Sequence, residues 1–293
     1  MSTRVLTRIA DVRREVVRAR ARGERIGFVP TMGALHKGHL SLINRALREC
    51  QYVVVSIFVN PTQFGQGEDY RKYPRTLARD RRLCSEAGIH LIFAPKVDQM
   101  YPPDFATYVV PQKSLAGCLC GKSRPGHFRG VDTVVLKLFN IVMPDVAYFG
   151  QKDYQQSVVI RRMVGDLNLN VNIRVLPTER ARDGLAVSSR NSYLSPAERK
   201  QAVCLYQALQ KARELVEKEC VTDAAKVRQA MRRIIAKNNL ATIDYVEIVH
   251  PQTLEPLKTV SGEAVAALAV FVGKTRLIDN IIIRFRKGRG YRC

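Results

Sequence analysis

Two histidines separated by two residues are the first side chains of this sequence that could act on a substrate. His36 and His39 lie in a loop between an apolar strand pattern and a helical pattern that begins at Leu40. Ligands of an open α/β sheet bind beyond the carboxyl ends of its strands, which is where this loop is expected. Gly33 and Gly38 permit close approach of the backbone to phosphates at a helix N-terminus. We therefore predict a phosphate-binding loop, with a metal pair or two unrelated surface histidines as alternatives; no carboxylate or cysteine of the loop completes a metal site.

A second polar cluster follows the next strand pattern and contains Asn60 and Gln63. The amide of Gln63 can donate and accept hydrogen bonds, so it could hold both a hydroxyl and a carboxylate, although a loop glutamine is more often simply solvated. The stretch from Gly65 to Tyr73 contains two glycines and mixed charges without apolar periodicity. Such a composition is typical of a mobile loop or a lid over a site.

Three further loops carry residues that bind anions or metal ions. Arg124 and His127 precede a helix, where they could bind a carboxylate substrate or form a surface ion pair. Lys152 could neutralise phosphate charge, and Asp153 could hold a magnesium ion. The hydroxyls and arginine of Ser188–Arg190 lie near an expected domain junction, where a loop can close on a triphosphate.

The elements that must position these loops form a parallel sheet. Apolar β-branched runs without alternation indicate strands buried on both faces. Between them, residues 131–142 repeat apolar positions at helical spacing, and Pro144 ends that helix. Repeated strand–helix–strand order predicts an α/β fold with a Rossmann-like, doubly wound parallel sheet. The predicted strands are Arg25–Thr31, Tyr52–Val59, Ile89–Ala94, Asp145–Phe149 and Val171–Leu176.

The pattern changes after about residue 178, which predicts domains of residues 1–178 and 179–293. The second is a smaller C-terminal α+β domain, and Ser195 with Pro196 forms a good helix start. Its predicted elements are helices over 196–219 and 222–239 and strands over 243–249, 264–272 and 277–283.

Composition indicates an ordinary folded protein. Of 293 residues, 46% are hydrophobic and 25% are charged, far from the apolar-poor composition of disorder. No apolar run reaches the roughly 18 residues that span a bilayer, and the charged N-terminus lacks the apolar centre of a secretory signal. The seven scattered cysteines are typical of reduced intracellular thiols. We therefore expect a cytoplasmic protein without a membrane partner.

The net charge of +22, from 48 basic and 26 acidic residues, favours anionic partners such as phosphate substrates or nucleic acid. Much of the excess lies at helix-surface positions and in the tail Arg284–Cys293, so a solvated basic surface is the simpler interpretation. An RNA-binding protein is the alternative from another class, but the sequence contains no aromatic stacking motif of a nucleic-acid module. A weak nucleic-acid affinity through the tail stays open.

Seven motifs, in their order and spacing, resemble a known family. The H-x-G-H pattern after the first strand is similar to the signature of the nucleotidyltransferase superfamily that forms adenylates and includes class I aminoacyl-tRNA synthetases. The full set resembles the pantoate–β-alanine ligase (pantothenate synthetase) family over essentially the whole chain. The motifs are VPTMGALHKGH, SIFVNPTQF, YPRT, RPGHFRG, FGQKDYQQ, DGLAVSSRN and RLIDN.

The resemblance implies which residues bind ATP. His39 would donate a proton or stabilise phosphate charge, with His36 beside it, and Lys152 and Arg190 would compensate charge as pyrophosphate leaves. These four are the residues implied to be catalytic. The residues implied to bind ATP are Met32, Gly33, Ala34, Leu35, His36, Lys37, Gly38, His39, Gly150, Gln151, Lys152, Asp153, Glu179, Val187, Ser188, Ser189 and Arg190.

The resemblance also implies a substrate site and a reaction. Gln63 and Gln156 would hold pantoate, and Gln63 would help to place β-alanine. With Mg2+ and ATP, pantoate would form an acyl adenylate that β-alanine then attacks, giving pantothenate and AMP. The first domain would bind nucleotide and pantoate, the second would act as a lid, and the family suggests a homodimer. The residues that match further positions lining the site are Asn60, Tyr73, Arg124 and His127.

Two features depart from the family pattern. Glu179 stands where relatives commonly carry an apolar residue whose backbone lies near the adenine, so we expect binding through the backbone to survive. The tail Arg284–Cys293 continues past the resemblance.

A different nucleotidyltransferase is the main rival within enzymes, but it would share H-x-G-H without Gln63, Gln156 and the RPGHFRG loop.

Overall fold

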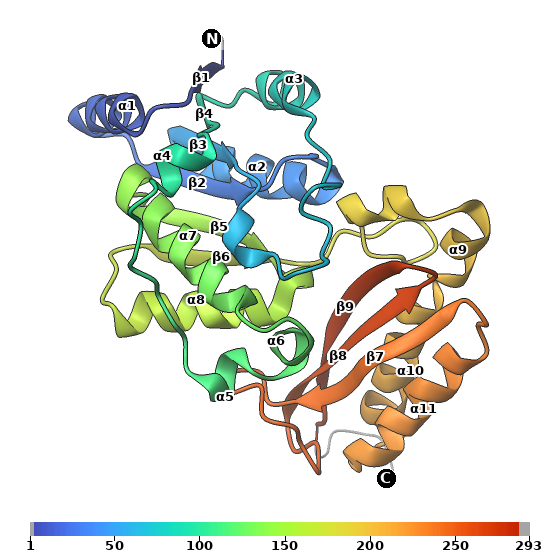
Figure 1. The fold of residues 1–293 in the computed structure, drawn as a ribbon. Coiled ribbons are helices and arrows are strands. Elements are labelled where there is room, and N and C mark those ends of the chain that lie inside the picture. The colour runs from blue at the N-terminus through green and yellow to red at the C-terminus, as the bar shows by residue number, and fades with distance from the viewer. Residues whose placement is uncertain (1–2, 287–293) are drawn as a thin grey trace. The chain divides into compact units, whose positions relative to one another are not determined.

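The computed structural model describes residues 3–286 and contains two compact units (Figure 1). The first consists of the chain up to residue 111 together with residues 124–151 and 156–177. The second consists of residues 112–123, residues 152–155 and the chain from residue 178 onward. Two short segments that precede residue 178 thus group with the C-terminal unit. The assignment of residues 1–178 and 179–293 as functional domains stays a prediction.

The first unit is built on a six-stranded parallel sheet, which confirms the predicted fold class. The strand order is β1-β4-β3-β2-β5-β6, so the chain builds outward from β2 in one direction and then returns to place β5 on its other side. In such a sheet, ligands bind where the order reverses, outside the carboxyl ends of the strands. That point lies between β2 and β5. The strands are β1 (Arg4–Leu6), β2 (Ile26–Thr31), β3 (Tyr52–Ile57), β4 (Leu91–Phe93), β5 (Val146–Gly150) and β6 (Asn172–Leu176).

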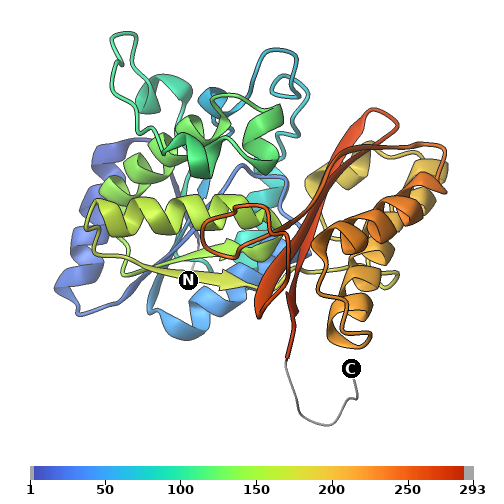
Figure 2. The ribbon, with the colours of Figure 1, turned by 90° about the horizontal axis from the view of Figure 1, so that it is seen from below.

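Helices cover both faces of this sheet (Figure 2). α2 packs against β2, β3 and β5 and contacts α3, whereas α1 and α7 contact each other and β2. Consecutive strand residues face opposite sides. Phe28 of β2 therefore meets Phe139 of α7 edge-on, with ring centroids 6.3 Å apart, while Val29 joins a buried cluster with Leu42 and Ile43 of α2. The elements are α1 (Ile9–Ala21), α2 (Lys37–Glu49), η1 (Pro61–Gln63), α3 (Leu77–Ala87), α4 (Val97–Met100), α7 (His127–Val142) and α8 (Tyr154–Asp166), of which α8 begins within the second unit.

The second unit contains an antiparallel sheet in the order β7-β8-β9, with α10 and α11 packed on it and on each other. Its core joins apolar residues of these two helices to alternate residues of the strands. The smaller α+β part of the predicted fold is thereby confirmed. Its elements are α5 (Lys113–Ala116), α6 (Leu119–Ser123), η2 (Gln151–Asp153, whose first residue belongs to the first unit), η3 (Ser189–Tyr193), α9 (Pro196–Gln201), α10 (Cys204–Glu217), α11 (Ala224–Ala236), β7 (Ala241–Val249), β8 (Glu263–Val272) and β9 (Thr275–Arg284).

Two details differ from the expectation. The helix predicted over 196–219 is divided into α9 and α10, although Ala202 and Val203 between them keep right-handed helical dihedral angles. The edge strand β1 was not predicted, because three residues are too few to show a period. The tail from residue 287 lies outside the described residues. None of the described helices is long and apolar enough to cross a membrane.

Candidate active site

The loop after β2 is held in a tight turn by its own backbone and by neighbouring strands. Gly33 and Ala34 both adopt left-handed backbone angles, with φ of 84° and 50°. A Cβ on Gly33 would lie 3.0 Å from a methyl of Ile57 and 3.1 Å from a carboxylate oxygen of Asp80. Glycine is therefore required here both for its φ and for the space. Thr31 fixes the entry to the turn, since its hydroxyl donates to the carbonyl of Ser56 at 2.7 Å and accepts from the N–H of Gly33 at 3.1 Å.

A buried carboxylate supports the same loop from α3. Asp80 is fully buried, and its two oxygens accept from the N–H groups of Ala34 at 3.0 Å and Leu35 at 2.8 Å. The hydroxyl of Thr76 donates to it at 3.1 Å. Hydrogen bonds to an ionised acceptor are the strong ones, and losing a buried acceptor leaves N–H groups unsatisfied. Asp80 therefore fixes the backbone that leads into the two histidines.

The two histidines lie together at the start of α2. Their rings stack with centroids 4.0 Å apart, His36 at the N-cap and His39 in the first turn. The backbone N–H of His36 donates to Nδ1 of His39 at 3.4 Å. Nδ1 of His39 is thereby engaged by the backbone of the loop. The structure thus brings the predicted pair together at a helix N-terminus, a position that favours phosphate.

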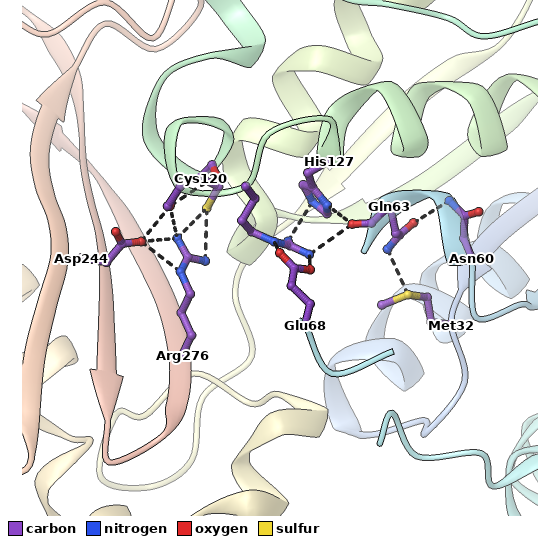
Figure 3. A network of polar contacts seen from close by, with 10 residues as sticks. Met32, Asn60, Gln63, Glu68, Cys120, His127, Asp244 and Arg276 are labelled. Carbon is purple, nitrogen blue, oxygen red and sulfur yellow. Dashed lines mark hydrogen bonds and ion pairs between the residues drawn. The ribbon is translucent and has the colours of Figure 1, made fainter. Parts of the chain in front are cut away.

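The amide of Gln63 is oriented by a buried asparagine (Figure 3). Asn60 is 1% exposed, and its Nδ2 donates to Oε1 of Gln63 at 3.1 Å. Its Oδ1 accepts from the hydroxyls of Tyr101 at 2.8 Å and Thr62 at 2.9 Å. With the oxygen of Gln63 engaged, its Nε2 points to the sulfur of Met32 at 3.0 Å, a weak acceptor. A donor is thereby presented next to the loop after β2.

A glycine allows the segment that carries Gln63 to lie directly on α7. A Cβ on Gly130 would be 2.2 Å from the carbonyl oxygen of Thr62, far inside van der Waals contact. The carbonyl of Gly130 also accepts from Nδ2 of Asn60 at 3.1 Å. The RPGHFRG motif therefore requires its last glycine for the close approach of η1.

Arg124 and His127 support the Gln63 backbone in this structure. Nδ1 of His127 donates to the Gln63 carbonyl at 2.7 Å, and its Nε2 accepts from Arg124 at 3.0 Å, a pattern that fits a neutral ring. Arg124 also holds Glu68 by two contacts of 2.7 and 2.5 Å. Burial tends to raise the pKa of Glu68, but the ion pair with Arg124 outweighs it and lowers that pKa overall. Glu68 thereby ties the predicted lid loop to the RPGHFRG motif.

The other predicted site residues of the first unit lie next to Phe64, at the end of β5 and at the start of α8. Tyr73 is buried with its ring edge-on to Phe64, centroids 6.1 Å apart. Gly150 is the last residue of β5, the strand next to β2, and Gln151 follows it. Gln156 is half-buried in the first turns of α8. Its neighbour Gln155 belongs to the second unit, where it bonds the backbone of Cys118 and Cys120 and serves a structural role.

In the second unit, the predicted residues lie on two segments. Lys152 and Asp153 are the last two residues of η2, and Nζ of Lys152 lies 3.9 Å from Oδ1 of Asp153. The loop from Glu179 to Arg190 folds back on itself, because the N–H of Val187 donates to the carbonyl of Glu179 at 2.9 Å. The side chain of Ser188 accepts from the N–H of Arg190 at 3.3 Å. The Glu179 side chain is exposed, so its contribution to the loop is made by its backbone.

The second unit also contains a polar cluster of Arg276, Asp244 and Cys120. Arg276 pairs with Asp244 at 2.7 Å, and both of its terminal nitrogens lie 3.7–3.8 Å from the sulfur of Cys120 (Figure 3). These groups satisfy one another. Cys120 is among the cysteines with free thiols, as are Cys50, Cys84, Cys118 and Cys204.

Asp80 and Gly130 are the supporting residues that the sequence did not reveal. Asp80 lies on α3 among other charged residues, which draw attention away from its burial. Gly130 is in a recognised motif, but only the structure shows that it faces the carbonyl of Thr62. A charged residue at the core-facing position of an amphipathic helix is the one signal that could have identified Asp80.

Comparison with known proteins shows which family the chain belongs to. The family model described as pantoate-beta-alanine ligase matches residues 4–282. The pantothenate synthetase of Pelotomaculum thermopropionicum is 54% identical over 279 residues, covering 95% of this chain and 98% of that protein. That of Heliobacterium modesticaldum is 57% identical over 261 residues, covering 89% and 92%.

Solved structures extend the likeness to the fold. Pantothenate synthetase from Thermus thermophilus superposes with a TM-score of 0.90 at 49% identity, covering 95% of this chain and 98% of that one. Pantoate-beta-alanine ligase from Francisella tularensis, complexed with Beta-gamma ATP and Beta-alanine, gives a TM-score of 0.78 at 35% identity, covering 95% and 97%. The match spans every motif that carries the resemblance, and the chain belongs to the pantoate–β-alanine ligase family.

Proposed function

We propose that this chain joins pantoate to β-alanine with ATP, through a pantoyl adenylate, using the residues that its loops present after β2, β3 and β5. The observation that carries the proposal is the strand order. β2 and β5 are neighbours at the reversal point of the sheet, and each ends in a motif of the family, the H-x-G-H loop and Gly150-Gln151. A nucleotide is expected at that point of a doubly wound sheet.

The loop Met32–His39 would bind ATP in the first unit. The N-terminus of α2 favours negative charge, and Lys37 adds a positive charge in its first turn. His39 would donate to a phosphate oxygen as charge develops on the leaving pyrophosphate, with His36 stacked beside it. This is electrostatic stabilisation by groups already in place. Gly33, Ala34, Leu35 and Gly38 would contribute backbone rather than side-chain contacts.

Gln63 and Gln156 would hold pantoate. The bond from Asn60 fixes which end of the Gln63 amide is available, and the weak contact with the Met32 sulfur can be replaced by a substrate oxygen. Asn60, Arg124 and His127 would then act on pantoate through Gln63, by holding its side chain and its backbone. Tyr73, packed on Phe64, would line the same region.

In the second unit, Lys152 and the loop Glu179–Arg190 would bind nucleotide phosphates. Lys152 and Arg190 carry the positive charges, while Ser188 and Ser189 supply hydroxyls. Val187 and Glu179 would offer backbone groups to the adenine, and the exposed Glu179 side chain would not take part.

The reaction follows from the need to activate a carboxylate, which does not react with an amine at neutral pH. A carboxylate oxygen of pantoate attacks the α-phosphorus of ATP, the bond to the bridging oxygen breaks, and pyrophosphate leaves. The free amine of β-alanine then attacks the acyl carbon, AMP leaves with the bonding electrons, and the amine proton passes to solvent. No side chain forms a covalent bond, so catalysis rests on orientation and charge compensation.

Magnesium would enter with ATP. Among residues 3–286 there is no group of three or more His, Cys, Asp or Glu side chains that could hold a metal ion. This fits Mg2+, which commonly binds through one or two carboxylates together with substrate phosphates and water. Asp153, half-exposed beside Lys152, is the carboxylate that could join such a set, where the ion would neutralise phosphate charge.

We further propose that the protein is cytoplasmic and forms a homodimer. In the first unit, the extended segment before α5 exposes Tyr108 and Val110, the latter to 71%, and a second copy of the chain would cover them. Light scattering on wild type and Val110→Asp tests this, with a dimer expected for the former and a monomer for the latter. A dimer of unchanged strength in the variant would place the interface elsewhere.

A weak affinity for nucleic acid through the basic tail Arg284–Cys293 stays a proposal, with most of that tail outside the described residues. Salt-sensitive retention on RNA that disappears when the tail is deleted, with ligase activity intact, would support it. Retention that survives the deletion would argue against the tail.

The test of the reaction is release of AMP from the purified protein with Mg-ATP, pantoate and β-alanine, omitting each component in turn. AMP that requires both organic substrates, and that is abolished in His39→Ala and Gln63→Ala, is the expected result. His250→Ala serves as the control, since that histidine lies in a turn of the second unit and accepts from two backbone N–H groups. AMP formed without pantoate would instead indicate a different nucleotidyl transfer.

A further inference from the structure

Two adjacent polar residues of β9 are buried in a strand that is otherwise mostly apolar. Asp279 is 2% exposed and Asn280 is 3% exposed, and both belong to the RLIDN motif. Burying a carboxylate and an amide is unfavourable unless each is fully hydrogen-bonded. The hydrogen-bond partners of Asp279 and Asn280 therefore indicate which segments these two residues position.

Asn280 holds the segment that carries Lys152. Its Nδ2 donates to the main-chain carbonyl of Lys152 at 2.9 Å, and both residues belong to the second unit. The lysine lies in η2, a single short turn, and its side chain is 19% exposed. A turn of this length has few internal bonds, so an external bond to its backbone determines where the lysine projects.

Asp279 holds the loop that carries Ser188–Arg190. Its two oxygens accept from Arg180 at 2.6 and 2.9 Å in a two-pronged pair. Arg180 also donates to the carbonyl of Gly184 at 3.0 Å and lies over the ring of Tyr206, 4.7 Å from its centroid. Burial raises the pKa of Asp279, the Arg180 guanidinium opposes that rise, and Lys152 is among the positive charges that act on it.

The contacts of Asp279 and Asn280 are linked, because these two residues are neighbours in β9 and bond each other. The N–H of Asn280 donates to Oδ1 of Asp279 at 2.8 Å, and Arg180 also reaches the carbonyl of Asn280 at 3.4 Å. Neighbouring strand residues point to opposite faces, so one dipeptide can reach two different segments. A shift of either segment is thereby opposed by the rigid sheet.

We propose that Asp279 and Asn280 are positioning residues that fix Lys152 and the Ser188–Arg190 loop in one geometry for the phosphates of ATP. The proposal rests on the proposed function of those two segments. Neither residue needs to contact the nucleotide. Asn280 acts through the backbone of Lys152, and Asp279 acts through Arg180.

The test compares Asn280→Ala with Asn238→Ala in pantoate-dependent pyrophosphate release. Asn238 makes the same kind of bond, from Nδ2 to the carbonyl of Ile234 at 3.1 Å, but at the end of α11. We expect Asn280→Ala to lower kcat at least about 10-fold, because small displacements of a charge-compensating group have effects of this size. The KM for pantoate should stay within about twofold, since Gln63 and Gln156 belong to the first unit. The Asn238→Ala variant should keep wild-type kcat.

A double-mutant cycle separates positioning from general stability. In a Lys152→Ala background, adding Asn280→Ala should change kcat by less than about twofold, because the group to be positioned is gone. Independent, multiplying effects would overturn the proposal, as would equal kcat values for Asn280→Ala and Asn238→Ala. Both outcomes leave wild-type activity intact and are therefore distinct from failure of the proposed function, in which the wild type itself would release no pantoate-dependent pyrophosphate.

Discussion

Nδ1 of His127 donates a hydrogen bond to the main-chain carbonyl of Gln63 at 2.7 Å, so a residue that resemblance places in the substrate site supports the backbone of another. The substitution His127→Ala removes this donor, so the Gln63 carbonyl loses the hydrogen bond from Nδ1. We expect kcat/KM for pantoate to fall about 10-fold, which corresponds to one hydrogen bond of roughly 1.4 kcal/mol. Steady-state kinetics with pantoate varied at saturating ATP measures this.

His127→Asn is the informative partner, because its amide nitrogen can donate from nearly the position of Nδ1 and should restore part of the activity. His90→Asn is the control. His90 accepts from the N–H of Val53 at 3.1 Å beside the amino end of β4, at the opposite edge of the sheet from the carboxyl ends. No rescue by His127→Asn would show that the imidazole itself meets pantoate.

Gly130→Ala should separate η1 from α7. The new Cβ would lie 2.2 Å from the Thr62 carbonyl, so the turn carrying Gln63 must move. We expect kcat/KM for pantoate to fall at least about 10-fold, since a displacement of this kind misplaces the reactants. The control is Gly165→Ala on α8, where no heavy atom lies within 4 Å of the new Cβ. That change should raise stability by about 0.5–1 kcal/mol without affecting catalysis. Equal activity of the two variants would contradict the close approach.

Asp80→Asn tests the support of the loop after β2. The new NH2 group would face a backbone N–H of Ala34 or Leu35 in place of an accepting oxygen. The loss should destabilise the protein by about 2 kcal/mol or more and raise the KM for ATP, because the loop leads directly into the histidines. Thermal unfolding and ATP-dependent kinetics measure the two effects. Asp98→Asn on the exposed face of α4 makes the same change in charge and should leave both unchanged. An unaltered KM for ATP in Asp80→Asn would mean that the loop keeps its shape without the carboxylate.

Local patterns were sufficient for the sheet and its loops, and insufficient for the contacts that hold those loops. The β2 run and the H-x-G-H motif are contiguous, so the strand and the phosphate-binding turn could both be read from neighbouring residues. Asp80 acts on Ala34 across 46 residues of chain, and no sequence period records such a pairing. The division of the second unit shows the same limit, because residues 112–123 and 152–155 join it through tertiary contacts alone.

The resemblance identified Asn60, Arg124 and His127 as site residues, while the structure shows that they contact Gln63 or its turn. A motif match shows that a residue is characteristic of a family. It does not show whether that residue contacts the substrate or another residue of the protein. The partners of a side chain decide between those roles. In the same way, the role that we propose for Asp279 and Asn280 of β9 could be inferred only from their contacts with Arg180 and Lys152.

Asp132 should make stability depend on pH near neutrality. It is 1% exposed on α7, and its Oδ1 has no hydrogen-bond partner among residues 3–286. Burial raises its pKa from 3.8 to about 7. Between these values the folded protein keeps the proton while the unfolded chain has released it. The stabilisation is therefore fully present below the unfolded pKa and is lost as the pH rises through about 7, with a slope of up to about 1.4 kcal/mol per pH unit.

Asp132→Asn mimics the protonated side chain and should remove this dependence. We expect its melting temperature to match wild type near pH 4 and to exceed it at pH 8, where the wild type carries a buried charge. Asp104→Asn, at an exposed position of the same unit, should show no such difference between the two pH values. A melting temperature for Asp132→Asn that tracks wild type at every pH would mean that water reaches this carboxylate and keeps it ionised, since a hydrated group gives no reason for its pKa to rise.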